Sequence, residues 1–160
     1  MEIIDYSLKY DEQIKDLLVE LQNYLIDIDD WHTQIMLSNY REDIFKIDLE
    51  KVKNQNGKIY LAKENENIIG LIIGVVYEND KIDKLTNTCL KTGEVLELIV
   101  KKNIRSNGIG NVLLKKIEEY FKKIGCKQIN IEVFGPNKKG LNFYEKNNYI
   151  IRDIIVSKKL

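Results

Sequence analysis

Several residue types are scarce in this sequence, and each scarcity excludes something. The two cysteines, Cys89 and Cys126, are far apart and lie outside any Cys-x-x-Cys motif or His/Cys cluster. That spacing argues against a structural zinc site, and so few cysteines are typical of a reducing compartment. With His32 as the one histidine, the sequence predicts no metal site.

Long apolar runs and an excess of charge are also missing. No segment approaches the roughly 18 uninterrupted apolar residues that a membrane span needs. The N-terminal segment MEIIDYSLKY carries neither the basic region nor the apolar region of a targeting signal. Lys and Arg number 25, as do Asp and Glu, and their interleaving leaves no basic stripe for nucleic acid. We therefore expect a cytoplasmic protein with no membrane and no nucleic-acid partner.

What the chain does contain is the composition of a folded domain. Of its 160 residues, 44% are hydrophobic and 31% are charged, and the apolar residues are spread along the whole length. No repeat, linker or low-complexity block divides the chain. We expect a single α/β domain over residues 1–160.

The N-terminal half predicts two helices and a hairpin. Apolar residues recur every three or four positions from Tyr10 to Ile28, which is the period of an amphipathic helix. A weaker helical pattern covers residues 35–53. Strands are expected at residues 3–7, 59–63 and 68–77, and a turn at 64–67 joins the last two as an antiparallel hairpin.

The C-terminal half predicts a parallel pair of strands joined by the clearest helix of the chain. A strand over 94–101 runs into Gly108 and Gly110, after which an apolar and a charged face alternate as far as Ile124. Gly125 ends this helix, and a returning strand follows. The remaining expected elements are a polar connection over 78–92, a strand over 128–134, a helix over 137–147 and a last strand over 149–156. The fold class is mixed α/β (α+β).

The turn Arg105-Ser106-Asn107-Gly108-Ile109-Gly110 joins a strand to a helix, and such a turn has a chemical use. The first N–H groups of a helix have no intrahelical partner and favour an anion such as a diphosphate. Glycine at two positions removes the Cβ atoms that would hold a phosphate away. Two nucleotide-binding folds are disfavoured, because the Walker Gly-Lys-Ser/Thr is missing and Leu113 replaces the third glycine of the dinucleotide motif.

Residues 105–110 resemble the R/Q-x-x-G-x-G/A signature of the GNAT acetyltransferase superfamily. Glu97-Leu98-Ile99-Val100 resembles that family's fourth strand, and residues 137–149 resemble its last helix and the strand after it. In order and spacing the resemblance covers residues 59–158. It implies a mostly antiparallel sheet, flanked by helices, in which the parallel strands 4 and 5 splay apart. Gly140 and Asn148-Tyr149 depart from the family's common alanine and Gly-Phe, and neither departure touches the expected chemistry.

The resemblance implies that acetyl-CoA or a close relative is the cosubstrate. Its pantetheine arm is expected to pair with the free edge of the fourth strand, and its diphosphate with the amides of residues 106–111. Asn137 resembles the family's asparagine on the cofactor side, although a helix N-cap explains it equally well. The expected cofactor-binding residues are Leu98, Ile99, Val100, Arg105, Ser106, Asn107, Gly108, Ile109, Gly110, Asn111, Asn137 and Tyr144.

Acyl transfer to an amine needs a base for the ammonium proton and an acid for the leaving thiolate. Tyr144 matches the family's tyrosine near the thioester sulfur and can supply that proton; the competing interpretation is that it packs the helix on the sheet. Glu94 and Glu97 are the candidate bases. Because side chains alternate along a strand, these two face opposite sides unless a bulge intervenes. The sequence leaves the choice between them open.

The segment between the first two helices is the expected acceptor entrance. Asp27, Asp29 and Asp30 would attract a cationic amine, and Trp31 would add a cation–π contact. His32 is expected to line the same pocket or to pack beside it. In the competing interpretation the acids are solvated, or one of them caps the following helix.

These features predict an acyl-CoA-dependent N-acetyltransferase that acts by direct attack in a ternary complex. The acceptor is expected to be the primary amine of a small molecule or peptide, and the chain a monomer or homodimer. The alternative is a non-catalytic GNAT-fold module that binds acyl-CoA for regulation. Retention of both glycines, Tyr144 and two strand-four carboxylates favours the enzyme.

Overall fold

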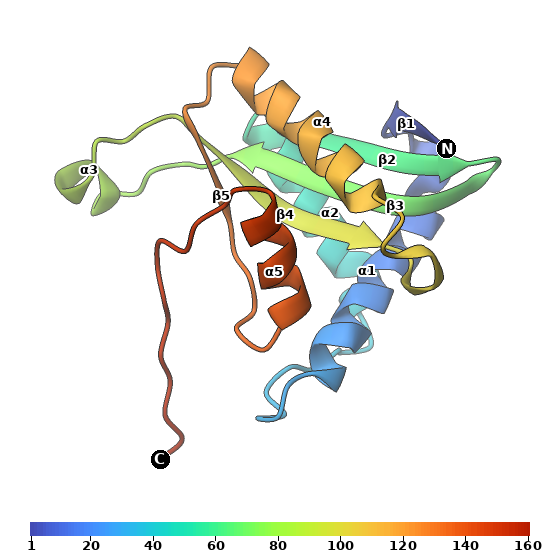
Figure 1. Cartoon of the computed structure of the whole chain (residues 1–160), viewed down its shortest axis with the longest axis horizontal. Coiled ribbons are helices and arrows are strands. Elements are labelled where there is room, and N and C mark those ends of the chain that lie inside the picture. Colours follow the sequence, from blue (N-terminus) through green and yellow to red (C-terminus); the bar gives the residue numbers. More distant parts are fainter.

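The computed structural model describes residues 1–160, and its five strands form one sheet (Figure 1). The strands are β1 (Glu2–Asp5), β2 (Lys58–Glu64), β3 (Asn67–Val76), β4 (Thr92–Val100) and β5 (Gln128–Ile131). Their order across the sheet follows the sequence; β4 and β5 are parallel and all other neighbours antiparallel. The predicted mixed α/β fold, with its hairpin and its parallel pair of strands, is confirmed.

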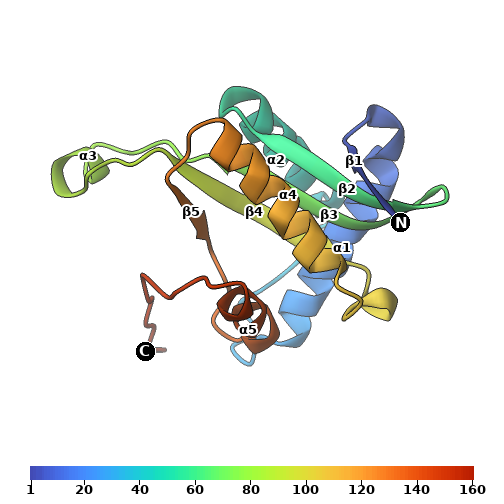
Figure 2. The same ribbon diagram turned by 45° about the horizontal axis from the view of Figure 1, so that its top comes forward.

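Helices cover both faces of this sheet. They are α1 (Asp11–Asp27), α2 (Tyr40–Asn54), α3 (Asp83–Thr86), α4 (Ile109–Lys123) and α5 (Lys138–Lys146), with 3₁₀ turns η1 (Leu8–Tyr10) and η2 (Lys102–Ile104). α1 and α2 lie together on one face and α4 crosses the other, while α5 lies beside the end where β4 and β5 diverge (Figures 1 and 2). No helix is both long and apolar enough to span a bilayer.

The core consists of two apolar layers that share β3. On one face of the sheet, α1 buries Ile14, Leu17 and Leu18, whose spacing of three and four puts them on one side of the helix. On the other face α4 buries Leu113, Ile117 and Phe121 in the same way. Burying each such side chain contributes about 1.5–3 kcal/mol. Because β3 lies between both layers, its residues from Ile68 to Val75 are buried, glycines included.

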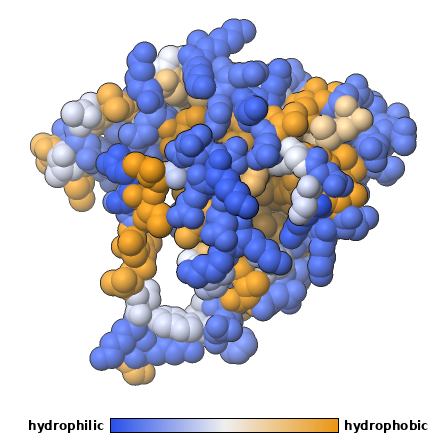
Figure 3. Space-filling model, in the orientation of Figure 1, coloured by the Kyte–Doolittle hydropathy of each residue, from blue (hydrophilic) through white to orange (hydrophobic).

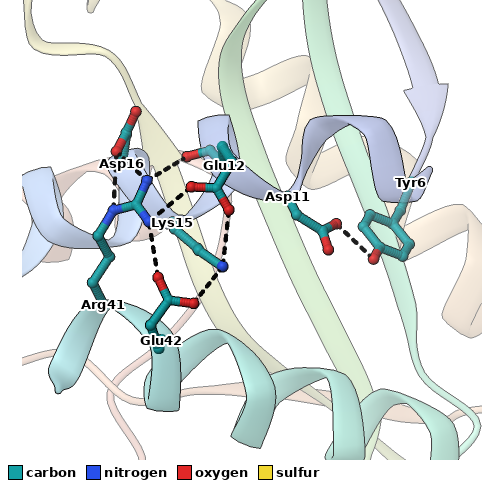
Figure 4. A network of polar contacts seen from close by, with 7 residues as sticks. All are labelled: Tyr6, Asp11, Glu12, Lys15, Asp16, Arg41 and Glu42. Atoms are coloured by element: carbon teal, nitrogen blue, oxygen red, sulfur yellow. Dashed lines mark hydrogen bonds and ion pairs between the residues drawn. The ribbon is translucent and has the colours of Figure 1, made fainter.

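A network of charged side chains joins α2 to α1 (Figure 4). Arg41 of α2 donates to Glu12 and Asp16 of α1 at 2.9 and 2.8 Å, and Lys15 of α1 bridges Glu12 and Glu42. The carboxylates are largely exposed, so each pair contributes at most about 1 kcal/mol. They tie the start of α2 to α1, while the buried residues Phe45 and Asp48 mark the side of α2 that faces the sheet.

The predicted last strand over residues 149–156 is wrong. No regular structure is present from Tyr149 onward: Tyr149 still packs on the core, and the residues after it run away from the body with an apolar surface that ends in a polar stretch (Figures 1 and 3). Ile150, Ile154 and Val156 are between 76% and 88% exposed. The segment has the composition of a strand, but a strand also needs a partner whose backbone groups complete the ladder, and no other strand pairs with it.

Three smaller differences concern the limits of elements. α2 begins at Tyr40 rather than near residue 35, and β5 ends at Ile131 rather than at Phe134. The connection expected over residues 78–92 contains the short helix α3, which stands away from the body. The early end of β5 matters most, because beyond it the edge of β4 that faces β5 has no strand partner.

Candidate active site

The two parallel strands stay together for only part of their length. β4 pairs with β5 from Thr92 to Val95, opposite Gln128 to Ile131, and then continues alone to Val100. On this side residues 96–100 have no strand partner, while β3 pairs with their other edge. The splayed opening implied by the sequence is therefore present. An unpaired strand edge offers N–H and C=O groups to an extended ligand.

A β-bulge in β4 lies where β5 departs. Val95 is opposite Gly74 and Glu97 is opposite Ile73, so Leu96 is an extra residue in this strand. Val95 and Leu98 both pack in the layer under α4. Alternation from each of them then directs Glu94 and Glu97 to the same face, toward α1 and α2. The condition left open by the sequence is met, and both glutamates face the same layer.

Glu97 lies in the unpaired part of β4, where its surroundings disfavour its charge. Burial, and then the negative charge of Asp48 on α2, raises the pKa of Glu97 to about 8, and Lys51 opposes this shift. Burial and the charge of Glu97 raise the pKa of the Tyr144 phenol well above its usual value. The two groups are therefore near enough for their charges to interact. One can take up a proton near neutral pH, and the other stays protonated.

Glu94 has a different neighbourhood. It lies in the part of β4 that pairs with β5, opposite Asn130, and its charge acts on Tyr77 at the end of β3. The charge of Glu97 instead acts on Tyr40 and Tyr144. Position therefore separates the two candidates, and Glu97 is the one beside the opening.

The glycine turn has the shape that an anion site requires. Gly108 has φ 79° and Ser106 has φ 71°, and α4 begins at Ile109 with no side-chain cap. A Cβ atom built on Gly108 would meet nothing within 4 Å, so the space outside it is open. At Gly110 a Cβ atom would lie 3.3 Å from the ring of Phe143 in α5. Gly108 therefore borders open space, whereas Gly110 lets α4 pack closely against Phe143 of α5.

Arg105 braces this turn. Its Nε donates to the Val100 carbonyl at 2.8 Å, its Nη2 lies 3.3 Å from Glu20 of α1, and its guanidinium lies 5.4 Å from the Tyr24 ring centre. The same Glu20 oxygen accepts the Lys102 backbone N–H at 2.7 Å. Arg105 thus fixes the turn to α1 and to the end of β4, and it occupies one carbonyl of the open edge.

Asn137 caps α5 and also contacts α1. Its Oδ1 accepts the Gly140 N–H at 2.9 Å and the Tyr24 hydroxyl at 3.1 Å. A Cβ atom at position 140 would come within 2.5 Å of the Asn137 amide, which explains glycine where alanine was expected. Asn148, in the position of a common glycine, adopts φ 66°, a left-handed conformation that asparagine tolerates. Both departures from the family pattern have a local cause.

The profile of the acetyltransferase (GNAT) family matches residues 25–149, which is most of the chain. The chain belongs to the GNAT family. It is 27% identical to an acetyltransferase of Sodalis glossinidius over 69% of this chain and 70% of that one. It is 30% identical to an N-acetyltransferase of uncharacterised function from Methanocaldococcus jannaschii over 60% and 54% of the two chains. General N-acetyltransferase activity follows from this membership, and GNAT enzymes in general use acetyl-CoA and act on amines.

Solved structures show the same fold. A Bacillus halodurans protein superimposes with a TM-score of 0.80 at 17% identity, covering 100% of this chain and 99% of its own. An aminoglycoside antibiotic 6'-N-acetyltransferase from Acinetobacter haemolyticus gives 0.73 at 15% identity, with coverage of 100% and 99%. At such identities the likeness concerns the fold.

In the acidic loop between α1 and α2, Asp29 was expected to contact the acceptor amine, but its carboxylate binds backbone groups of the loop itself. Asp29 is only 4% exposed, and its carboxylate accepts the N–H groups of Trp31, Thr33 and Gln34 at 2.6–3.0 Å. These bonds, led by that from Gln34, lower the pKa of Asp29 to about 2. Its lone pairs are directed to its own loop, so we assign it to holding the loop rather than to contacting the acceptor.

The other expected acceptor residues in this loop lie at the surface. Trp31 is 42% exposed, with Lys159 Nζ 5.5 Å from its ring centre, and Asp30 and His32 are exposed as well. His32 has φ 53°, within the turn that Asp29 closes. Their role toward an acceptor stays a prediction.

Asp29→Ala is expected to loosen this loop, whereas Asp30→Ala is its matched control. Chymotrypsin should cleave after Trp31 several-fold faster in the first variant, because the carboxylate holds three backbone N–H groups. In wild type the loop should loosen as pH falls from about 4 toward 2, since a lowered pKa means the ionised form stabilises the fold. Equal cleavage of both variants would contradict this structural role.

Two residues near Glu97, Asp48 and Tyr40, are not predicted from the sequence. Asp48 is 3% exposed and the charge of its carboxylate acts on Glu97 and on Tyr40. Tyr40, Ile44 and Asp48 are four residues apart and so share one side of α2. The signal was an acid on the apolar side of an amphipathic helix, where acids are almost never buried without a reason.

Two surface hollows flank these elements. One, of about 380 Å³, lies along α2 and shares Tyr40 with the site; it is lined mainly by apolar side chains. The other, of about 520 Å³, lies between β2 and α4 on the opposite face and is lined by Lys58, Lys116 and other charged residues. No group of three or more His, Cys, Asp or Glu side chains is arranged to hold a metal ion. Four groups with raised pKa values, Tyr40, Asp48, Glu97 and Tyr144, are instead linked by the charges of Asp48 and Glu97.

Proposed function

We propose that this chain transfers the acetyl group of acetyl-CoA to a primary amine by direct attack in a ternary complex. The observation that carries the proposal is the position of Glu97 and Tyr144 beside the unpaired edge of β4. A carboxylate that takes up protons near neutral pH and a phenol that keeps its proton are the acid–base pair that amine acylation needs.

Two features of the structure support acetyl-CoA as the cosubstrate. On the side of β5, residues 96–100 have no strand partner, so an arm containing amides can pair with this edge as a short added strand. The uncapped start of α4 and the open space outside Gly108 suit a diphosphate. Arg105 contributes indirectly in this proposal, because it holds the turn in place through Val100 and Glu20.

Each residue of the pair has one proton to move. Glu97 accepts a proton from the ammonium group of the acceptor, which leaves a neutral nitrogen with a lone pair. That nitrogen forms the new C–N bond at the thioester carbonyl, and the C–S bond breaks. Tyr144 donates its proton to the departing thiolate and regains one from the nitrogen. The net products are the amide, the free thiol and the proton held by Glu97.

Acetyl-CoA is expected to raise the melting temperature of the wild-type protein, because a ligand that binds only the native state stabilises it. Gly108→Gln should abolish this rise, since its side chain would enter the space where the diphosphate is expected. Differential scanning fluorimetry with and without acetyl-CoA measures both effects.

Gly125→Gln is the matched control for that substitution. Gly125 ends α4 with φ 86°, and a Cβ atom there also meets nothing within 4 Å, so the backbone strain is similar. It should lower stability like Gly108→Gln yet keep the shift with acetyl-CoA. Gly110 is a poorer choice, because its substitution disturbs Phe143. A full shift in Gly108→Gln would place the diphosphate elsewhere.

The activity itself is tested by thiol release from acetyl-CoA across a panel of polyamines, aminoglycosides, amino acids and peptide N-termini. Release that depends on an amine supports the enzyme. Binding of acetyl-CoA without release for any amine would favour the alternative, a GNAT-fold module that binds acyl-CoA for regulation.

A further inference from the structure

Asp48 presents a problem that acetyl transfer by Glu97 and Tyr144 does not explain. The residue is only 3% exposed, and its buried Oδ2 has no hydrogen-bond partner. It takes part in none of the ion pairs of the chain. A buried carboxylate oxygen without a partner costs stability, and nearly all buried polar groups in folded proteins avoid this. Such an atom calls for a ligand.

The position of Asp48 indicates where that ligand lies. α2 packs on the face of the sheet to which the bulge turns Glu97, and the charge of Asp48 acts on Glu97 directly. Tyr40 lies on the same side of α2 two turns before Asp48, and burial together with the charges of both carboxylates raises its pKa. Asp48 therefore lies on the same side of the sheet as Glu97, near enough for the two charges to interact.

The charged groups around Asp48 and Glu97 carry a negative excess. The groups facing Glu97 are Glu94 on its own strand, Tyr40, Asp48 and Lys51 on α2, and Tyr144 on α5. Lys51 is the one cation among them; it is exposed and forms no ion pair with either acid. Counting Glu97 itself, three carboxyl groups face one solvated cation, which leaves room for one further positive charge.

We propose that Asp48 and Glu97 together bind the primary ammonium group of an aliphatic amine acceptor, with Asp48 as its fixed counter-ion and Glu97 as its proton acceptor. This inference rests on the proposed acetyl transfer and names its substrate class. An ammonium group has three N–H donors, enough for Asp48 Oδ2, for Glu97 and for one further partner. A carboxylate on the acceptor close to its nitrogen would be repelled by the same pair.

The protonation of the pair agrees with this division of roles. Burial raises the pKa of Asp48 to about 6, and that of Glu97 is raised to about 8. At neutral pH the two acids together hold about one proton and one negative charge. An arriving ammonium group matches that charge and favours loss of the proton from Glu97. Asp48 remains ionised while Glu97 takes up and releases a proton in each turnover.

Asp48→Asn tests the proposal, with Glu50→Gln, an exposed acid on the same helix, as the matched control. The amide keeps the volume and removes a buried charge, so the variant should fold and should melt higher than wild type above pH 6. For butylamine we expect KM to rise roughly 10- to 100-fold, the usual effect of losing a hydrogen bond to a charged group. KM for aniline, which is uncharged at neutral pH, should change little.

Two further readouts separate binding from a merely structural role. The acid limb of the pH profile of kcat/KM should move to lower pH in Asp48→Asn, because the repulsion on Glu97 is gone. In wild type, glycine, whose carboxylate is next to its nitrogen, should be a much poorer acceptor than ethylamine. Asp48→Glu, which keeps the charge, should recover part of the butylamine KM.

Failure of the proposal is distinct from failure of acetyl transfer. If wild type releases thiol but Asp48→Asn has an unchanged KM for butylamine and an unchanged pH profile, Asp48 does not bind the acceptor. If wild type shows no turnover, butylamine binding to the CoA-loaded protein is measured by NMR titration. Binding that is lost in Asp48→Asn and kept in Glu50→Gln would support the ammonium site; no binding to wild type would overturn it.

Discussion

Glu97→Gln is expected to lower kcat/KM by about 10²- to 10⁴-fold, the usual contribution of a general base. The substitution keeps the size of the side chain and removes its ability to accept a proton. The dissociation constant for acetyl-CoA should not change, because the expected cosubstrate contacts are backbone groups of β4 and the start of α4. Steady-state kinetics and a thermal shift with acetyl-CoA measure the two quantities separately.

The pH profile of the wild-type protein gives the same test without a mutation. Only ionised Glu97 can accept a proton, and its pKa is raised to about 8. The value of kcat/KM should therefore rise with pH and level off above about 8. The Glu97→Gln variant should lose this limb of the profile. A wild-type profile that is flat between pH 6 and 9 would remove Glu97 from the role of base.

Glu94→Gln is the matched control. Both glutamates lie on β4 and face α1 and α2, since the bulge at Leu96 brings them to one side. Only Glu97 lies in the unpaired segment, so Glu94→Gln should keep kcat/KM within a few-fold of wild type. If Glu94→Gln instead shows the large loss of kcat/KM and Glu97→Gln stays near wild type, the proton acceptor is Glu94.

Tyr144→Phe is expected to lower kcat by about 10²- to 10⁴-fold with acetyl-CoA affinity unchanged, because the ring stays and the proton donor is lost. Burial and the charge of Glu97 raise the pKa of this phenol above its usual value. It therefore stays protonated over the whole assay range, and its loss should lower the plateau of the pH profile without moving the limb near pH 8.

Tyr149→Phe provides the comparison for that variant. The rings of Tyr144 and Tyr149 lie edge to face with centres 5.7 Å apart, and the Tyr149 hydroxyl donates to Glu118 of α4 at 2.9 Å. Removing this hydroxyl should cost about 1 kcal/mol of stability and leave kcat unchanged. If Tyr144→Phe behaves in the same way as Tyr149→Phe, Tyr144 is a packing residue.

Local patterns predicted most of the secondary structure, because their causes are local. The three-and-four spacing of apolar residues located α1 and α4 to within two residues of their limits, and the glycines at 108 and 125 marked the limits of α4. The strand at residues 149–156 failed for a complementary reason. Its β-prone residues are a local property, whereas pairing depends on a neighbour at a distance, and β5 ends before it could serve as one.

The sequence by itself determined the family, the mixed α/β fold, the glycine turn and Tyr144 as a candidate acid, since each rests on short motifs or on periodicity within one element. Only the tertiary structure decided which glutamate lies at the opening, because that depends on where β4 stops pairing with β5. It also decided that Asp29 serves its own loop and that Asp48 faces Glu97. Whether a carboxylate is solvated, satisfied or left without a partner depends on chain segments that are distant in sequence, and only packing brings these together.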